Sequence, residues 1–437
     1  MNFFKKAVFA LKNSLYREGV TVKLSEEMSA AISKWDSMYA DNGRLALASS
    51  IAAETARLTT LELKSRVMGS KRADFLNGEY QKFLDGIRNI TELACATGGV
   101  VFKPYVQGKE IKVTAIRAEN FIPTEFNESG EIMGAAFLER YYAGRKVYTR
   151  IEQHSFKNGE YTIKSTAYLG EDEKELGKQV PLSETIWSDI APVVTMSGVK
   201  APLFSYFKMP MANCIDSASP LGVSVYARAC GLIQDAEEQY KRLLWEFESG
   251  ERALYVDQSA MRRDENGNCQ IPDRRLYRLL NSGDDTLFAD WSPEFRDASL
   301  LNGLNEILRR IEFNSALAYG TLSDVMNVDR TAEEIKVSKQ RSYAHILEIQ
   351  KALKTALTKL LAAMNTLCDL YGLSESGEYN LSFSFDDGVV SEKREEFKER
   401  MQLMEFGAIE PWEMRVWYLG EDENTAKMSL GKRKEET

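Results

Sequence analysis

The sequence predicts an α+β protein, in which helices and an antiparallel sheet occupy separate stretches of the chain. Apolar residues recur with the 3.6-residue period of a helix before Gly98-Gly99, and with the two-residue period of a strand after it. Beyond residue 217 the pattern becomes helical again, over segments far longer than those before it. Helices, then strands, then helices is the element order of an α+β fold.

Residues 25–96 are predicted to be helical. Ser25 is a helix start that two glutamates follow. A second helix is expected between the breaks at Gly43 and Gly69, and one further helix is expected over residues 75–93.

Six β-branched and aromatic runs of alternating polarity follow, separated by turn residues. The predicted strands cover residues 100–106, 111–116, 121–126, 132–142, 147–154 and 161–169. We expect one antiparallel meander, followed by an acidic loop at residues 171–175.

Two Ser-Pro pairs mark the starts of long helices, because proline is tolerated at the first helical position. The first helix is predicted from Ser219-Pro220 to Gly250, and the second from Ser292-Pro293 to Gly320. A compact strand-and-turn insertion separates them.

A third long helix begins at a capping box, Thr331-Ala332-Glu333-Glu334. From Ile346 to Tyr371 its apolar residues are three and four apart, which predicts a coiled-coil-like seam that ends at Gly372. A strand over 381–385 and a charged helical tail follow.

The composition excludes several classes of protein. The 437 residues carry 56 Lys and Arg against 65 Asp and Glu, a net charge of −9. The five cysteines are widely spaced without a CxxC pair, so neither a disulfide framework nor a structural zinc is expected. No apolar stretch is long enough to span a membrane, and residues 1–24 form a basic arm instead of a signal peptide.

Catalytic signatures are missing. The sequence has no GxxxxGK[ST], GxGxxG, GxSxG or HExxH motif, so we expect no ATPase, no cofactor and no metal. The two histidines, His154 and His345, are isolated and are interpreted as surface or boundary residues. Adjacent carboxylates such as Glu333-Glu334 point to different sides of an element and do not form a catalytic pair.

Basic residues form three short clusters: Arg262-Arg263, Arg274-Arg275 and Arg309-Arg310. Residues 251–298 hold 7 basic and 10 acidic residues, so the insertion is not a DNA-gripping patch. Taken alone, Arg309-Arg310 fits a solvated helix face or an ion pair between subunits better than a phosphate clamp.

Several local segments, in their order, resemble one family from about residue 30 to 420. They are Trp35-Asp-Ser-Met-Tyr39, Ile51-Ala-Ala-Glu54, Asn120-Phe-Ile-Pro-Thr124, Pro202-Leu-Phe-Ser-Tyr-Phe-Lys208, Ser219-Pro-Leu-Gly-Val-Ser224, Thr331-Ala-Glu-Glu-Ile335 and Phe383-Ser-Phe-Asp-Asp387. The chain resembles the portal proteins of tailed double-stranded-DNA bacteriophages, in particular siphophage portals of the Gram-positive host group.

The resemblance implies a portal fold and a division of the chain. The implied parts are a basic arm (1–24), a β-rich wing (25–218), a stem helix (219–250), a clip (251–291), a second stem helix (292–318), a tunnel-loop region (319–335), a long helix with a returning wing strand (336–390) and a helical crown (391–437).

The resemblance also implies a structural role without catalysis. It implies a ring, usually of twelve copies, at the capsid vertex, through which double-stranded DNA passes without sequence specificity. The implied partners are the large terminase, a head-completion or adaptor protein, and the major capsid and scaffolding proteins, with no membrane. The implied location is the virion, after assembly in the host cytoplasm.

Within that resemblance, some residues are expected near DNA, because a few basic residues on an acidic wall guide a phosphate rod without gripping it. They are Arg309, Arg310, Asn327, Asp329, Arg330, Lys336 and Lys339. The clip arginines, Arg262, Arg263, Arg274 and Arg275, are expected to dock partners. Two alternatives stay open: another virion structural protein such as a minor head protein, and a β-meander hydrolase with a helical oligomerisation module.

Overall fold

The structure is a computed structural model, and it describes most of the chain. The described residues are 22–41, 43–157, 160–171, 176–251, 253–257, 262–263, 268, 270, 277–280, 288–291, 294–324, 332–385, 397, 400–419 and 427. The chain divides into a large unit, Met1–Thr60 with Ser65–Phe383, and a small unit, Leu61–Lys64 with Ser384–Thr437. The chain combines helices with mainly antiparallel sheets, which confirms the α+β class.

Helices predominate at the start of the described part of the large unit. They are α2 (Glu26–Ala40), α3 (Leu47–Thr60), α4 (Lys71–Leu84) and α5 (Ile87–Thr97). The Ser25 hydroxyl accepts a hydrogen bond from the Met28 amide at 3.2 Å, which confirms the predicted helix start. The single helix expected over residues 75–93 is wrong, because α4 ends at Leu84 and α5 begins after Gly86.

The predicted meander forms two sheets instead of one. The first sheet has the order β10-β2-β3 and contains β2 (Gly99–Gln107), β3 (Glu110–Arg117) and β10 (Ser205–Lys208). The second contains β4 (Phe121–Phe126), β5 (Ile132–Ala143), β6 (Lys146–Lys157), β7 (Glu160–Gly170) and β8 (Lys178–Val180) in order, with β9 (Val193–Ser197) also on β7. The division occurs because a 3₁₀ turn, Ala118–Asn120, separates β3 from β4, and distant β10 pairs with β2.

The first sheet packs against the long helix α8 (Ala332–Tyr371) through β2 and β10. Phe102 of β2 and Phe207 of β10 are fully buried, with ring centroids 5.9 Å apart. The Ser205 hydroxyl donates to the Ala356 carbonyl of α8 at 2.6 Å. The predicted apolar seam of α8 is buried from Ile346 to Leu367, but its last predicted residue, Tyr371, is 59% exposed, so the seam ends one turn earlier than expected. The helix ends before Gly372, as predicted.

The predicted start of the next helix at Ser219-Pro220 is wrong. Helix α6 runs from Cys230 to Ser249. Residues 219–224 have no regular secondary structure and lead into a turn, and the run from Leu221 to Tyr226 is buried. The Val225 amide donates to the Cys95 carbonyl at 3.0 Å, so this segment takes part in the core of the large unit. A Cβ atom on Gly222 would lie 2.0 Å from the Gly98 oxygen, so this close approach requires glycine.

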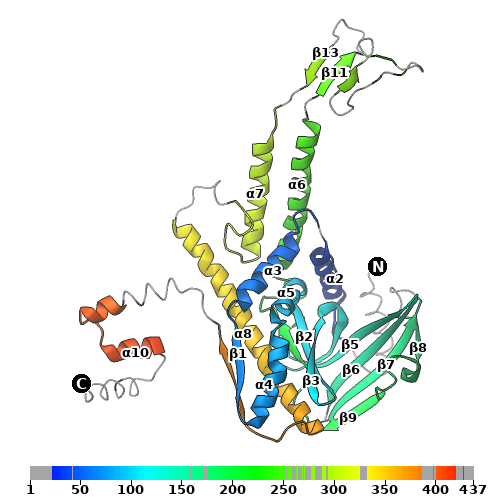
Figure 1. The fold of residues 1–437 in the computed structure, drawn as a ribbon, viewed down its shortest axis with the longest axis vertical. Helices are drawn as coiled ribbons and strands as arrows, with labels where there is room; N and C mark the ends of the chain where they lie inside the picture. The colour runs from blue at the N-terminus through cyan, green and yellow to red at the C-terminus, as the bar shows by residue number, and fades with distance from the viewer. Residues whose placement is uncertain are drawn as a thin grey trace. The chain divides into compact units, whose positions relative to one another are not determined.

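Helices α6 and α7 (Asp297–Asn314) pack side by side, and the insertion lies between them in the sequence (Figure 1). Helix α7 begins at Asp297 and ends at Asn314, so the predicted bounds at Ser292 and Gly320 are wrong at both ends. The insertion contains β11 (Ala253–Asp257), β12 (Tyr277–Leu280) and β13 (Phe288–Trp291) in the order β12-β11-β13. This confirms the expectation of strands there.

The predicted strand near residue 381 is present as β14 (Tyr379–Ser384), and it pairs with β1 (Lys64–Gly69), which the sequence did not indicate. The small unit contains α10 (Pro411–Leu419). In the part of the chain that the structure describes, no helix is both long and apolar enough to cross a membrane.

Candidate functional site

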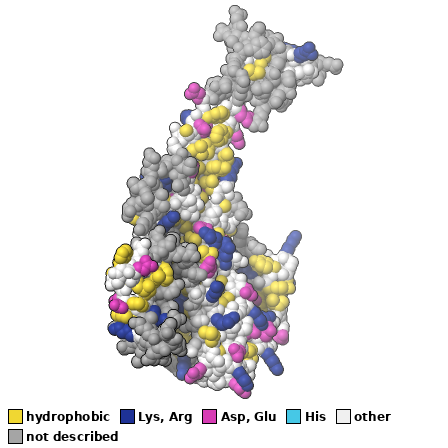
Figure 2. All heavy atoms as spheres, turned by 60° about the vertical axis from the view of Figure 1, so that its left-hand side comes forward, with side chains coloured by type: hydrophobic (Ala, Val, Ile, Leu, Met, Phe, Trp, Pro, Cys, Tyr) yellow, Lys and Arg dark blue, Asp and Glu magenta, His cyan; other side chains and the backbone are white. Residues whose placement is uncertain are grey.

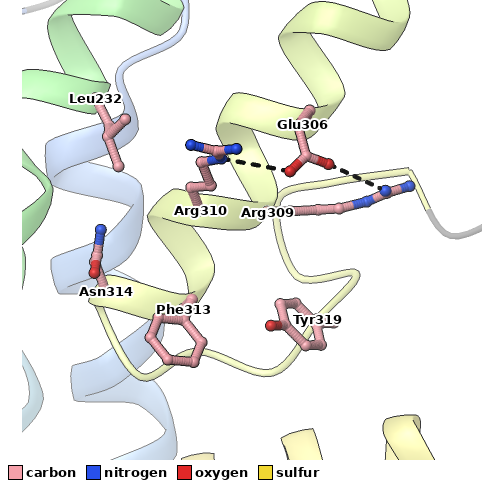
Figure 3. A pocket seen from close by; sticks show the side chains of 7 residues that line it. All are labelled: Leu232, Glu306, Arg309, Arg310, Phe313, Asn314 and Tyr319. Atoms are coloured by element: carbon pink, nitrogen blue, oxygen red, sulfur yellow. Dashed lines mark hydrogen bonds and ion pairs between the residues drawn. The ribbon is translucent and has the colours of Figure 1, made fainter.

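The C-terminal half of α7 carries two neighbouring arginines, Arg309 and Arg310, that share one carboxylate. Glu306 lies one turn earlier, and i,i+3 and i,i+4 spacings place side chains on the same helix face. The two carboxylate oxygens of Glu306 lie 3.4 Å from Arg309 Nη1 and 3.4 Å from Arg310 Nε (Figure 3). The sequence-predicted pair is therefore brought together on one carboxylate.

The two arginines differ in exposure. The Arg310 side chain is 68% exposed, whereas that of Arg309 is 18% exposed. Exposed ion pairs of this length contribute little to stability, typically about 0–1 kcal/mol, so a competing anion can replace Glu306 as the partner of Arg310. The site can offer a weak, exchangeable contact to phosphate.

An open pocket of about 440 Å³ lies beside these arginines. Its remaining lining is Leu232 of α6, Phe313 and Asn314 at the end of α7, and Tyr319 in the segment that follows (Figure 3). The pocket is thus lined by aliphatic and aromatic side chains as well as by the arginines and Asn314.

Arg341 of α8 approaches the same end of α7. Its guanidinium carbon lies 4.5 Å from the ring centroid of Phe313 and 5.3 Å from that of Tyr319. Its Nη2 donates to the Leu317 carbonyl at 3.2 Å. Stacking on two aromatic rings fixes the guanidinium, so the start of α8 is held beside the end of α7.

The structure places only part of the predicted DNA-proximal set. Asn327, Asp329 and Arg330 lie outside the described residues, and Lys336 is described only as a position within α8. Lys339 is exposed on α8 and does not line the pocket.

The insertion arginines are placed only in part. Arg262 and Arg263 are exposed, and the Arg262 carbonyl accepts a hydrogen bond from the Gln270 amide at 2.7 Å. Arg274 and Arg275 lie outside the described residues. The docking of partners by these four arginines stays a prediction.

The interpretation of both histidines as surface or boundary residues is wrong. His154 is 2% exposed and His345 is 9% exposed. His154 Nε2 lies 2.6 Å from Glu152, and its Nδ1 lies 2.7 Å from the Tyr161 hydroxyl. Both ring nitrogens are occupied within the core, so His154 is a structural residue.

Charges around His154 set its ionisation and that of its partner. Burial lowers the pKa of His154, although Glu152 opposes this shift. Burial opposes ionisation of Glu152, but the hydrogen bond with His154 and the charges of Lys103 and Arg150 outweigh it and hold the pKa of Glu152 well below its usual range. Lys103 Nζ lies 2.6 Å from Glu152, which links β2 of one sheet to β6 of the other.

Three residues near the α7 arginines were missed by the sequence reasoning: Asn305, Glu312 and Arg341. The available signal was weak. Glu312 stands four residues after Leu308 and directly after Ile311, so a carboxylate ends the apolar stripe of α7. A carboxylate at such a position needs hydrogen-bond donors, but the sequence does not show where they come from. Among the described residues no cluster of three metal-ligating side chains occurs.

The family model of "Phage portal protein, SPP1 Gp6-like" matches residues 78–415. The chain therefore belongs to this family of phage portal proteins, which confirms the family resemblance and the structural, head–tail connector function expected from it. The family is structural instead of enzymatic, and a phage portal is a component of the virion.

Comparison with solved structures finds a similar chain in "Neck of native GTA particle computed with C12 symmetry". The two chains are 12% identical, the TM-score is 0.40, and the match covers 84% of this chain and 88% of that chain. No curated protein matches the sequence.

Proposed function

We propose that this portal protein forms a closed ring whose channel passes double-stranded DNA in both directions during packaging, retention and ejection. The observation that carries the proposal is the arginine pair on α7, which shares one exposed carboxylate beside the α7–α8 connection. A pair held this weakly can contact a passing phosphate and release it again.

The net charge of the chain supports passage in preference to binding. Each tight Lys or Arg contact to phosphate adds affinity for DNA through counterion release. Such contacts along the channel would slow the passage of the DNA. The chain carries a net charge of −9, and a ring multiplies this value by its number of copies. A broadly acidic wall with few basic contacts guides DNA with little friction.

The parts of the chain receive roles in this proposal. Helices α6 and α7 are the stem that lines or backs the channel, and residues 251–291 between them are the clip that docks the large terminase and then a head-completion or adaptor protein. Residues 25–218 with β14 form the wing, residues 319–335 the tunnel-loop region, and residues 391–437 the crown. Major capsid and scaffolding proteins contact the assembled ring in the host cytoplasm.

Size-exclusion chromatography with light scattering tests the ring. Twelve copies of the 49.5 kDa chain, 12 × 49.5, have a mass of about 600 kDa. An end-on projection image of the same particle gives the number of copies. A strictly monomeric preparation would contradict the proposal.

Replacing both Arg309 and Arg310 by Ala tests the channel contact. We expect rings of unchanged mass and an altered amount of DNA per particle after packaging. Arg57→Ala is a matched control, because Arg57 forms the same i,i+3 pair with Glu54 on α3. An unchanged DNA content in the double variant would refute the role of the pair.

Arg330→Ala with Lys336→Ala applies the same test to the α7–α8 connection. The expected result is altered packaging or retention of DNA with an intact ring. Loss of the ring in this variant would remove the assignment of these two residues to the channel.

A further inference from the structure

The segment that follows α7, residues 315–324, folds back along the helix that precedes it. We call it the return segment. Helix α7 ends in a reversal at which Ala316 has a positive φ of 55°. The Leu317 amide donates to the Glu312 carbonyl at 2.9 Å, and the Ala316 amide donates to the Phe313 carbonyl at 3.3 Å. These two bonds form a Schellman motif, which turns the chain back toward α7.

The Glu312 side chain holds the far end of the return segment. It is 0% exposed. Its Oε1 accepts hydrogen bonds from the amides of Leu322 at 2.6 Å and Ser323 at 2.9 Å, and its Oε2 accepts one from the Ser323 hydroxyl at 2.8 Å. One buried carboxylate therefore satisfies three donors of a segment that has no regular secondary structure.

Asn305 adds a second attachment, seven residues earlier on the same face of α7. Its Oδ1 accepts from the Asp324 amide at 2.8 Å, and its Nδ2 donates to the Asp324 carbonyl at 3.4 Å. Both backbone groups of Asp324 are thus bound to one side chain. Asp324 is the last described residue before α8, so the α7–α8 connection begins from a fixed point.

Arg341, in the third turn of α8, joins that helix to the same place. Its hydrogen bond to the Leu317 carbonyl and its stacking on Phe313 and Tyr319 join α8 to the return segment. The return segment is therefore held by three side chains, Glu312 and Asn305 from α7 and Arg341 from α8, all of which lie in the described part of the chain.

We infer that Glu312 is a positioning residue, which with Asn305 and Arg341 sets where the α7–α8 connection leaves the stem. This inference rests on the proposed function, because it assigns the attachment to the part of the chain expected next to DNA. A charged carboxylate at this position is otherwise costly, since a buried charge needs strong partners. An apolar residue could fill the space but could not bind the amides of Leu322 and Ser323.

Hydrogen exchange in the full-length protein tests the attachment directly. In Glu312→Ala we expect the amides of residues 322–324 to exchange at least about tenfold faster, because each lost bond exposes a buried donor. Peptides from the centre of α7 should keep their exchange rates. Glu312→Gln retains one amide-accepting oxygen and should restore most of the protection. Unchanged exchange in Glu312→Ala would overturn the inference.

Two milder variants keep the test valid if Glu312→Ala fails to fold. Ser323→Ala removes only the hydroxyl bond, and Asn305→Ala removes only the bonds to Asp324. Each should raise exchange at its own site. Asn302→Ala is the matched control, because Asn302 is exposed on the same helix one turn earlier. Equal exchange in Asn305→Ala and Asn302→Ala would contradict the attachment.

DNA content of assembled particles tests the consequence. We expect Glu312→Ala rings to form and to package or retain less DNA, and Glu312→Gln to recover most of the loss. Faster exchange with a normal DNA content would refute the positioning role. A wild-type protein that forms no ring would refute the proposed function instead, and it would leave the exchange result standing.

Discussion

Two regions of the molecule are stabilised in different ways. One is the region of the sheets packed on α8, and the other is the pair of helices α6 and α7. Around β2, aromatic side chains are buried on the sheet, with Phe102, Phe207 and Tyr80 all at 0% exposure. The α6–α7 pair instead buries a narrow stripe that includes Ile233, Leu243 and Ile311. Two helices alone can bury only the faces that they turn toward each other.

The pair also leaves large apolar side chains in contact with solvent, visible along it in Figure 2. They are Trp245 at 61%, Phe247 at 42%, Phe295 at 46%, Leu301 at 45% and Phe313 at 57% exposure. Exposed apolar surface of this kind marks interaction sites. The large apolar side chains of the sheet region are therefore buried within one chain. Those of the α6–α7 pair are exposed, as expected of a surface that further copies of the chain would cover.

The largest expected effect is in the sheet core. Phe102→Ala should lower the free energy of unfolding by about 3–5 kcal/mol, because it leaves a cavity among buried rings. Tyr105→Ala on the same strand should cost much less, since Tyr105 is 40% exposed. Urea unfolding of the full chain measures both. Equal losses would show that the sheet core is not the main source of stability.

The buried stripe of the pair should give the next largest effect. Ile311 is fully buried, and Ile311→Ala should cost about 2–4 kcal/mol, with Leu301→Ala as the exposed control on the same helix. The loss should appear in the α6–α7 region and leave the sheets folded, which hydrogen exchange can resolve. Simultaneous unfolding of the sheets would break the comparison between the two regions.

A pH effect should follow from the buried His154. Its pKa is lowered in the folded protein, so only the unfolded chain binds this proton as the pH falls through the ordinary histidine value of 6.5. Stability is therefore fully present above that pH and lost below it, by about 1 kcal/mol per pH unit for each such histidine. His345 has a pKa lowered in the same direction.

Urea midpoints between pH 7.5 and 5.5 measure this effect. Each of His154→Gln and His345→Gln should remove about half of the slope if the two histidines contribute equally. The pKa of Glu152 is lowered, so its contribution is lost only as the pH falls below the ordinary glutamate value of 4.5, outside this window. If neither variant reduced the change of the urea midpoint with pH, the two histidines would not be buried in their neutral form.

The smallest expected effect is stabilising. Ala316 has the left-handed backbone conformation that costs a residue with a side chain about 1 kcal/mol, so Ala316→Gly should raise stability by about 0.5–1 kcal/mol. Ala362→Gly, at an exposed position in the interior of α8, should lower it by a similar amount. A thermal scan of both variants checks the signs. Loss of stability in Ala316→Gly would show that the reversal after α7 is not strained.

The helix patterns show how far local sequence predicts this fold. The apolar seam of α8 from Ile346 to Leu367 and the stop at Gly372 are as expected, because a helix fixes which residues share a face. The start at Ser219-Pro220 was misleading, since a Ser-Pro pair also suits an extended segment. Leu221, Val223 and Val225 are apolar because their segment is buried beside Cys95 and Gly98, a contact that local sequence does not encode.

The arginine pair and its surroundings divide in the same way. The sequence by itself determined that Arg309 and Arg310, three and four residues after Glu306, each lie within reach of that carboxylate, because 3.6 residues complete a helical turn. Only the tertiary structure decided that Glu312 binds Ser323, that Arg341 stacks on Phe313, and that distant β10 joins β2. These contacts depend on where the chain returns in space, and periodicity along the sequence carries no information about that return.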